Sequence, residues 1–133
     1  MEFQLEVVPV PVSDVDRAKR FYAEQVGFVV DLDIPLGEGT RLVQMTPPGS
    51  ACSIHLNSAL GVPPGILEGL QLMVSDIEAI RAELVECGVD ATPVRHLEDG
   101  AWVDGRGEDW NSFVFFGDPD GNGWVLQERP GRG

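Results

Sequence analysis

The sequence predicts an α+β fold of two tandem β-α-β-β-β modules, because it contains an internal repeat. Residues 12–16 (Val-Ser-Asp-Val-Asp) return as residues 74–78 (Val-Ser-Asp-Ile-Glu). Each copy follows a strand-like run, at 5–11 and at 69–73, and precedes a stretch with apolar residues at helical spacing. Since both copies keep the same order of signals, each is predicted to be one module of the fold.

A helix-start signal opens both repeats, since Ser13 precedes Asp16 and Ser75 precedes Glu78 at the S-x-x-[DE] spacing. In this capping box the two side chains satisfy backbone N–H groups of the first helical turn. We therefore expect one helix to begin at each serine and to end at the next glycine. The apolar faces comprise Val15, Ala18, Phe21, Tyr22 and Val26 before Gly27, and Ile77, Ile80, Leu84 and Cys87 before Gly88.

The remaining strands are predicted from β-branched and aromatic runs that lie between turn residues. Residues 46–49 (Thr-Pro-Pro-Gly) and 118–121 (Asp-Pro-Asp-Gly) place proline and glycine where a tight reversal needs them. We expect the second of these turns to position the last strand. The predicted strands are 28–33, 40–46 and 51–56 in the first copy, and 89–95, 112–116 and 123–128 in the second.

Length predicts one domain over residues 1–133, because a chain of this size can bury a core of its own. The first module covers about residues 1–57, a linker with a Pro-Pro-Gly turn covers 58–67, and the second module covers about 68–130. Residues 96–111 form a polar, glycine-rich insertion whose length is typical of lids and binding loops.

The acidic composition excludes two classes of partner. A formal net charge of -13 argues against nucleic acid and an anionic membrane, since either would need a basic face, and it favours solubility and tolerates a cationic guest. No apolar run has the length of a membrane span, and the first residues carry an acid where a signal peptide would be basic. Cys52 and Cys87 form no paired pattern. We therefore expect a cytoplasmic protein with both cysteines reduced and in the core.

The motifs resemble a known superfamily over nearly the whole chain. V-S-D-V-D-R-A-K-R-F-Y at 12–22, Gly-Phe at 27–28, V-S-D-I at 74–77 and D-P-D-G-N-G-W-V-L-Q-E at 118–128 are similar to the glyoxalase, bleomycin-resistance and extradiol-dioxygenase superfamily, also named the vicinal oxygen chelate superfamily. The resemblance implies a cupped mixed sheet with the helices outside and the ligand inside, often completed by a homodimer. It implies no single function, because metal-dependent isomerases, epimerases, dioxygenases and thiol transferases share this fold with metal-free proteins that sequester antibiotics.

The resemblance also implies that a divalent metal ion would be held on the first and last strand of each module. Those positions are Val7 and His55 in the first module, and Gly69 with either Val125 or Gln127 in the second, depending on the alignment of the last strand. Val7 and Gly69 have no side-chain donor, so His55 and Gln127 offer at best two ligands where three or four are expected. A metal-dependent reaction is therefore disfavoured. His55 is interpreted as a pocket contact, with a role as general base as the alternative.

Side-chain alternation along the strands predicts which residues would face a ligand. Pro9 is critical, because a bulge at this proline would reverse the faces of the first strand. Trp102 and Trp110 in the insertion would add flat surfaces for a planar guest, or would only anchor the loop, whereas Trp124 is expected in the core or a dimer interface. The predicted ligand-binding residues are Val7, Pro9, Ser53, His55, Gln71, Met73, Trp102, Trp110, Val125 and Gln127.

The leading hypothesis is a homodimeric, metal-free binding protein of the bleomycin-resistance type. It would sequester a hydrophobic or aromatic metabolite or antibiotic without a cofactor. No catalytic residue is assigned, because the sequence contains no P-loop, no G-x-S-x-G elbow and no H-E-x-x-H motif. The alternative is a metal-dependent glyoxalase-like lyase or isomerase, or an extradiol-type dioxygenase, that uses His55 and Gln127. A third hypothesis is a structural domain without a ligand.

Overall fold

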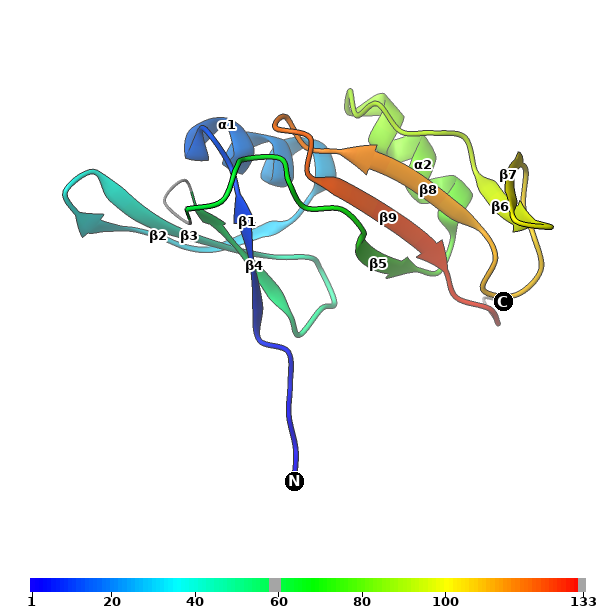
Figure 1. Cartoon of the computed structure of the whole chain (residues 1–133), viewed down its shortest axis with the longest axis horizontal. Helices are drawn as coiled ribbons and strands as arrows, with labels where there is room; N and C mark the ends of the chain where they lie inside the picture. The colour runs from blue at the N-terminus through cyan, green and yellow to red at the C-terminus, as the bar shows by residue number, and fades with distance from the viewer. Residues whose placement is uncertain (58–60, 132–133) are drawn as a thin grey trace. The chain divides into compact units, whose positions relative to one another are not determined.

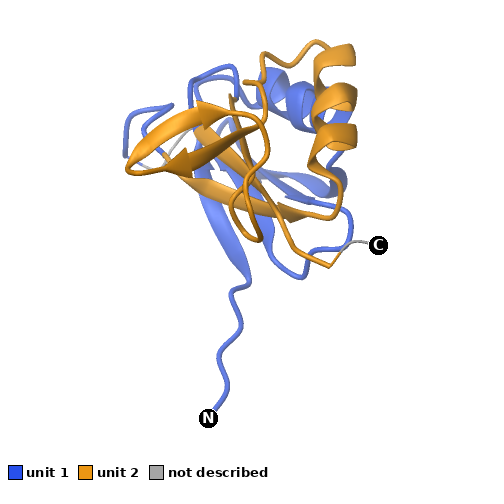
Figure 2. Ribbon diagram, turned by 90° about the vertical axis from the view of Figure 1, so that its right-hand side faces the viewer, with its two compact units in different colours: residues 1–67, 118–122 blue, residues 68–117, 123–133 orange. Residues whose placement is uncertain are grey.

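The computed structural model of the chain describes residues 1–57 and 61–131, which form two compact units. Each unit contains one sheet and one helical segment, so the predicted α+β class and the tandem modules are confirmed (Figure 1). The units, coloured separately in Figure 2, comprise residues 1–67 with 118–122, and residues 68–117 with 123–133.

The first unit has the predicted β-α-β-β-β order, and its sheet has the strand order β1-β4-β3-β2. β1 runs parallel to β4, and the other neighbours are antiparallel. Residues 58–60 of the predicted linker 58–67 lie outside the described residues. The elements are β1 (Val7–Pro11), α1 (Val15–Arg20), a π-helical continuation η1 (Phe21–Val26), β2 (Val29–Gly37), β3 (Thr40–Thr46) and β4 (Ser53–Asn57).

The second unit has a sheet of five strands in the order β5-β9-β8-β6-β7. β5 runs parallel to β9, as β1 does to β4, and the remaining pairs are antiparallel. Its elements are β5 (Leu70–Val74), α2 (Ile77–Glu86), β6 (Arg95–Glu98), β7 (Ala101–Asp104), β8 (Phe113–Gly117) and β9 (Gly123–Glu128).

The helix caps differ from the predicted ones. Asp14 and Asp76, not Ser13 and Ser75, are the N-cap residues. Their carboxylates accept hydrogen bonds at 3.1 Å from the backbone N–H groups of Arg17 and Ala79 respectively. A carboxylate at this position also interacts favourably with the helix dipole, which a neutral serine does not. Both helical segments do end at a left-handed glycine, with φ +92° at Gly27 and +87° at Gly88.

The predicted strand 89–95 is wrong, and the predicted insertion 96–111 is partly ordered as a β-hairpin. β6 and β7 pair over four residues each, and only Arg95 of β6 pairs with β8. Thr92 explains the irregular segment before β6, because its hydroxyl accepts the N–H of Phe115 at 3.0 Å in place of a backbone carbonyl. The following residue is a proline, which has no N–H to donate to a ladder.

One face of each sheet is buried together with apolar side chains of its own helix. In the first unit Met45 and Leu56 alternate with half-buried neighbours, and in the second Trp124 and Leu126 do so. Trp124 is 3% exposed and stacks on Phe116 with ring centroids 6.2 Å apart, so its predicted core position is confirmed. The opposite face of each sheet is the more exposed one.

The two cysteines are not core residues as predicted, because Cys87 is exposed and Cys52 is half-buried. Cys87 comes at the end of the apolar stripe of α2, where it forms the C-cap and the helix stops. No helix among residues 1–57 and 61–131 has the length and apolar character needed to span a membrane.

Candidate functional site

The predicted residues of the first unit share one face of its sheet. Val7 lies opposite Ser53 and Pro9 lies opposite His55, in an unbroken register of five pairs between β1 and β4. No bulge interrupts β1 at Pro9, so the predicted alternation holds, and Pro9 is exposed. These four residues are therefore brought together within the first unit.

A polar network on this face includes three residues that the sequence reasoning missed. Nε2 of His55 lies 2.9 Å from Oε1 of Gln44, and Nε2 of Gln44 donates to Asp31 at 3.4 Å. The hydroxyl of Thr46 donates to the same carboxylate and lies 2.6 Å from the hydroxyl of Ser53. Polar residues at alternate positions of β3 were a signal for Gln44 and Thr46, whereas Asp31 lies at a register irregularity of β2.

The direction of this network fixes the tautomer of neutral His55. A carboxylate only accepts, so Gln44 turns its NH₂ group toward Asp31 and its carbonyl oxygen toward His55. His55 then carries its proton on Nε2, which leaves Nδ1 as a hydrogen-bond acceptor. The first unit can therefore accept a hydrogen bond at this position, which suits the pocket contact predicted for His55.

The predicted strand residues of the second unit also share one face. Gln71 lies opposite Val125 and Met73 opposite Gln127 between β5 and β9. On the other side of β9, Phe115 pairs with Val125 and Phe113 pairs with Gln127. Sequence reasoning missed these two phenylalanines, although they alternate along β8 with the buried Val114 and Phe116. The open face of this sheet therefore combines apolar, aromatic and amide side chains.

Trp102 of β7 completes an aromatic cluster on this open face. Its ring lies edge-on to Phe113 and to Phe115, with centroids 5.4 and 5.1 Å apart and interplanar angles of 80° and 79°. Trp102 is nevertheless 49% exposed. Edge-to-face contacts hold the indole in place and leave part of its surface free for a further aromatic ring.

Gln127 connects β5 to the loop that carries Trp110. Its Oε1 accepts from Nε2 of Gln71 at 2.8 Å, and its Nε2 donates to the backbone carbonyl of Trp110 at 2.8 Å. We call Gln71, Gln127 and the Trp110 carbonyl the amide relay. Trp110 has φ +62°, which is uncommon for a residue with a Cβ, and its side chain is 50% exposed.

An ion pair fixes the loop before Trp110 to the body of the second unit. The buried Glu128 carboxylate binds the guanidinium of Arg106 and also accepts the buried N–H of Ile77 at 3.0 Å. The Glu128 carboxylate raises the pKa of Arg106 above its usual value. Both terminal nitrogens of Arg106 bind Glu128, so an ion pair anchors this loop. The hydrogen bond from Gln127 to the backbone carbonyl of Trp110 anchors it a second time.

Strand register identifies the counterpart of His55 in the second module. Pro9 and Gln71 each lie three residues before the repeated Val-Ser-Asp element, and they pair with His55 and Val125 respectively. Val125 is therefore the equivalent of His55, and the alternative alignment at Gln127 does not agree with the pairing.

This register leaves the implied metal site with one donor. Of its four positions, only His55 has a side chain that can bind a metal, since Val7, Gly69 and Val125 have none. Within residues 1–57 and 61–131, no group of three or more His, Cys, Asp or Glu side chains is placed to hold an ion. The residues of this chain thus do not fit the divalent metal that the resemblance implies.

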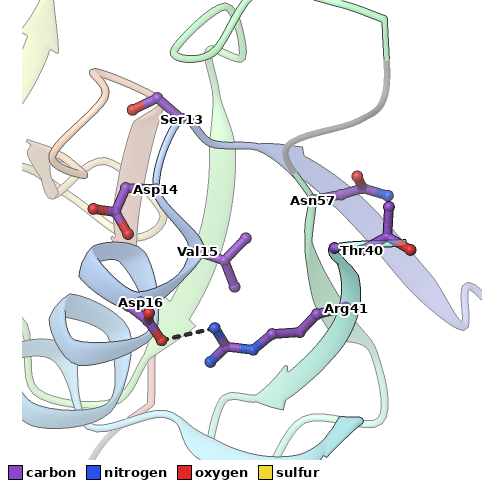
Figure 3. A pocket seen from close by; sticks show the side chains of 8 residues that line it. Ser13, Asp14, Val15, Asp16, Thr40, Arg41 and Asn57 are labelled. Carbon is purple, nitrogen blue, oxygen red and sulfur yellow. Dashed lines mark hydrogen bonds and ion pairs between the residues drawn. The ribbon is translucent and has the colours of Figure 1, made fainter. Parts of the chain in front are cut away.

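A hollow of about 320 Å³ lies elsewhere in the first unit, and none of the predicted ligand-binding residues lines it (Figure 3). Its wall includes Arg41, whose guanidinium binds Asp16 at 2.7 Å and Asp33 at 2.7 and 2.9 Å. Arg41, with Lys19, holds the pKa of the Asp33 carboxyl well below its usual range. Because these charges bind one another, we interpret the cluster as a structural link between α1 and the β2–β3 hairpin.

Comparison with known proteins gives consistent similarities. A family model described as the Glyoxalase/Bleomycin resistance protein/Dioxygenase superfamily matches residues 4–126. TnmS3, an antibiotic binding protein from Streptomyces sp. CB03234, is 35% identical in sequence, and its structure matches with a TM-score of 0.78 over 96% of this chain and 97% of that chain. A superfamily member from Sphaerobacter thermophilus DSM 20745 is 28% identical, with a TM-score of 0.77 over 96% and 98%. YetH of Bacillus subtilis (strain 168), an uncharacterized protein, is 29% identical over 130 residues, which are 94% of this chain and 98% of YetH.

Proposed function

Because the chain belongs to the glyoxalase/bleomycin resistance protein/dioxygenase superfamily, we propose that it is a metal-free protein that sequesters a planar aromatic metabolite or antibiotic. The observation that carries this proposal is the half-exposed Trp102, held edge-on against Phe113 and Phe115. An indole that is already immobilised gains a stacking partner at little cost in conformational entropy.

The other residues of the open face support the same function. Val125 and Met73 provide apolar surface, with Met73 62% exposed, and Gln71 and Gln127 provide a few polar groups. This mixture is typical of a site that binds a small molecule and orients it by hydrogen bonds. The description of TnmS3 as an antibiotic binding protein supports an antibiotic as the guest, and sequestration would then confer resistance. A net charge of -13 favours cationic guests over anionic ones.

The alternative function is a metal-dependent lyase, isomerase or dioxygenase. These reactions need an ion that polarises the substrate or activates dioxygen. The donor set of this chain argues against such an ion, since Val7, Gly69 and Val125 cannot ligate it. We therefore propose binding without a cofactor.

We also propose that the protein works as a cytoplasmic homodimer. Phe3 and Leu5 of the first unit are exposed apolar residues just before β1, which is an edge strand of its sheet. Such side chains suit an interface between copies of the chain. The two cysteines of the sequence form no paired pattern, which suits a reducing compartment. Sedimentation velocity over a range of concentrations tests the dimer, and a species with the mass of one chain throughout would contradict it.

Calorimetric titration with 9-aminoacridine, a flat cation, tests the binding function. In buffer with EDTA we expect saturable binding, and we expect Trp102→Leu to weaken it about fivefold, because one aromatic contact contributes about 1 kcal/mol. Leu36→Ala, which removes an exposed apolar side chain outside the site and outside the proposed interface, is the control and is expected to bind like the native protein. Binding that disappears with EDTA, or that Trp102→Leu does not change, would contradict the proposal.

A further inference from the structure

We infer that the guest carries a hydrogen-bond donor, such as a phenolic O–H or an amine N–H, and that Oε1 of Gln71 accepts from it. The inference rests on the proposed function, since it specifies which aromatic molecules the open face of the second unit would select. The evidence for it is the orientation of the Gln71 and Gln127 amide groups in the amide relay.

That direction is fixed at the Trp110 end of the relay. A backbone carbonyl only accepts, so the atom of Gln127 that lies 2.8 Å from it is the NH₂ nitrogen. The carbonyl oxygen of Gln127 therefore turns toward Gln71 and must accept from its Nε2 at 2.8 Å. Both amide orientations follow from one backbone group. Oε1 of Gln71 therefore turns away from Gln127 as an acceptor, while one N–H of its Nε2 is already used in the relay.

Gln71 offers this acceptor to solvent. The residue is exposed on β5, and no donor within residues 1–57 and 61–131 lies within hydrogen-bond distance of its Oε1. A guest with a donor would complete the relay at this end. A guest that places only an acceptor against Oε1 of Gln71 would bring lone pairs against lone pairs there, which costs affinity. The relay thus discriminates by chemistry rather than by size.

The acceptor lies within reach of the aromatic cluster. Gln71, Val125 and Phe115 are side by side in register across β5, β9 and β8. Adjacent strands are about 4.8 Å apart, so the backbones of Gln71 and Phe115 are about 10 Å apart. A flat ring system that lies over Val125 and stacks beside Phe115 and Trp102 would present its edge to Gln71. One guest can therefore use the aromatic cluster and the acceptor together.

Two probes that differ only in the donor test this inference on the full chain. We expect 2-naphthol to bind about three- to tenfold more tightly than 2-methoxynaphthalene, which is the effect of one hydrogen bond. Gln71→Met keeps the length of the side chain without its polar atoms, and is expected to bring the ratio of the two dissociation constants to about one. Gln4→Met, an exposed glutamine outside both sheets, is the control and keeps the native ratio.

A second pair, 2-naphthylamine and its N,N-dimethyl derivative, must show the same order on the native protein, so the test does not depend on the variant alone. Equal affinities within both pairs, or a preference that survives in Gln71→Met, would overturn the inference and leave the proposed function standing. Failure of all four probes and of 9-aminoacridine to bind would instead overturn the proposed function. Circular dichroism melting curves establish that each variant is folded.

Discussion

His55 and Val125 occupy equivalent positions in their two sheets, because each lies opposite the residue that precedes the repeated Val-Ser-Asp element by three places. The two modules therefore share strand register while they differ in side-chain chemistry at the position that matters for metal binding. The imidazole of His55 can bind a metal ion, whereas the isopropyl group of Val125 cannot, so the two modules do not supply matching ligands. The register leads directly to a prediction about metal content.

Purified protein that is incubated with manganese, iron, nickel and zinc, then desalted without chelator, is expected to retain far less than one metal ion per chain. The reason is that a single histidine does not supply the three or more ligands of a stable site. Elemental analysis by mass spectrometry provides the measurement, and His96→Ala is the matched control for His55→Ala. If the native protein and His96→Ala retained about one metal ion per chain and His55→Ala lost it, the metal-free function would be contradicted. That result would favour the metal-dependent enzyme.

The hydroxyl of Tyr22 donates to the buried carboxylate of Asp118 at 2.7 Å, and both residues belong to the first unit. Tyr22→Phe removes this donor and leaves the carboxylate less well satisfied. We expect the free energy of unfolding to fall by about 1.5–3 kcal/mol, the usual contribution of a hydrogen bond to a charged group. Urea denaturation followed by circular dichroism measures the loss. A change below about 0.5 kcal/mol would mean that Asn122, which also donates to Asp118, compensates.

The order of elements and the faces of the strands were predictable from the sequence. The repeat gave the two β-α units, and side-chain alternation with period two placed Val7, Pro9, Ser53 and His55 together without any knowledge of the register. Pro9 was the uncertain residue in that prediction, because a proline often causes a bulge in a strand. β1 accommodates Pro9 without a bulge, because β1 is an edge strand on which one missing N–H costs little.

The partners of these residues were not predictable, because they depend on which strands are neighbours and in what register. Nothing in the sequence brings Gln44 to His55 or Phe115 to Val125, since these pairs meet only through antiparallel pairing. The β6–β7 hairpin was also missed, because its four-residue strands are too short for a clear alternation. Trp102 therefore lies on a strand beside the aromatic cluster, not on a free loop.

Asp33 makes the stability of the first unit sensitive to acid. Its pKa is lowered chiefly by the hydrogen bonds from Arg41 and then by those from Lys19, so its stabilisation is full above the unfolded-state pKa of about 4. That stabilisation is lost as the pH falls through the lower folded-state pKa.

At pH 7 we expect Asp33→Asn to reduce the free energy of unfolding by about 1 kcal/mol, and we expect the difference from the native protein to shrink below pH 4. Urea titrations at several pH values measure this, with the exposed Asp90→Asn as control. A difference that stays constant down to pH 2 would contradict the ion-pair explanation.

His96 of β6 has an acceptor at each of its ring nitrogens. Nδ1 lies 2.9 Å from the carbonyl oxygen of Gly105, and Nε2 lies 2.9 Å from a carboxylate oxygen of Glu98. Only the doubly protonated ring donates to both acceptors. The hydrogen bond to the Gly105 carbonyl has the larger effect and the one to Glu98 the smaller, and together they raise the pKa of His96 above 6.5. The positive charge therefore stabilises the fold fully below about pH 6.5, and this contribution is lost as the pH rises through the folded-state pKa.

A ¹⁵N NMR titration of the His96 ring is expected to give a midpoint above 6.5, and Glu98→Gln is expected to lower that midpoint. His96→Gln should melt at a lower temperature than the native protein at pH 5.5, because the native ring then donates to both acceptors. The two melting temperatures should converge at pH 9, where the native ring has lost one of its protons. A His96 midpoint at or below 6.5, or a melting difference that grows with pH, would show that the Gly105 carbonyl and Glu98 do not hold the charged form.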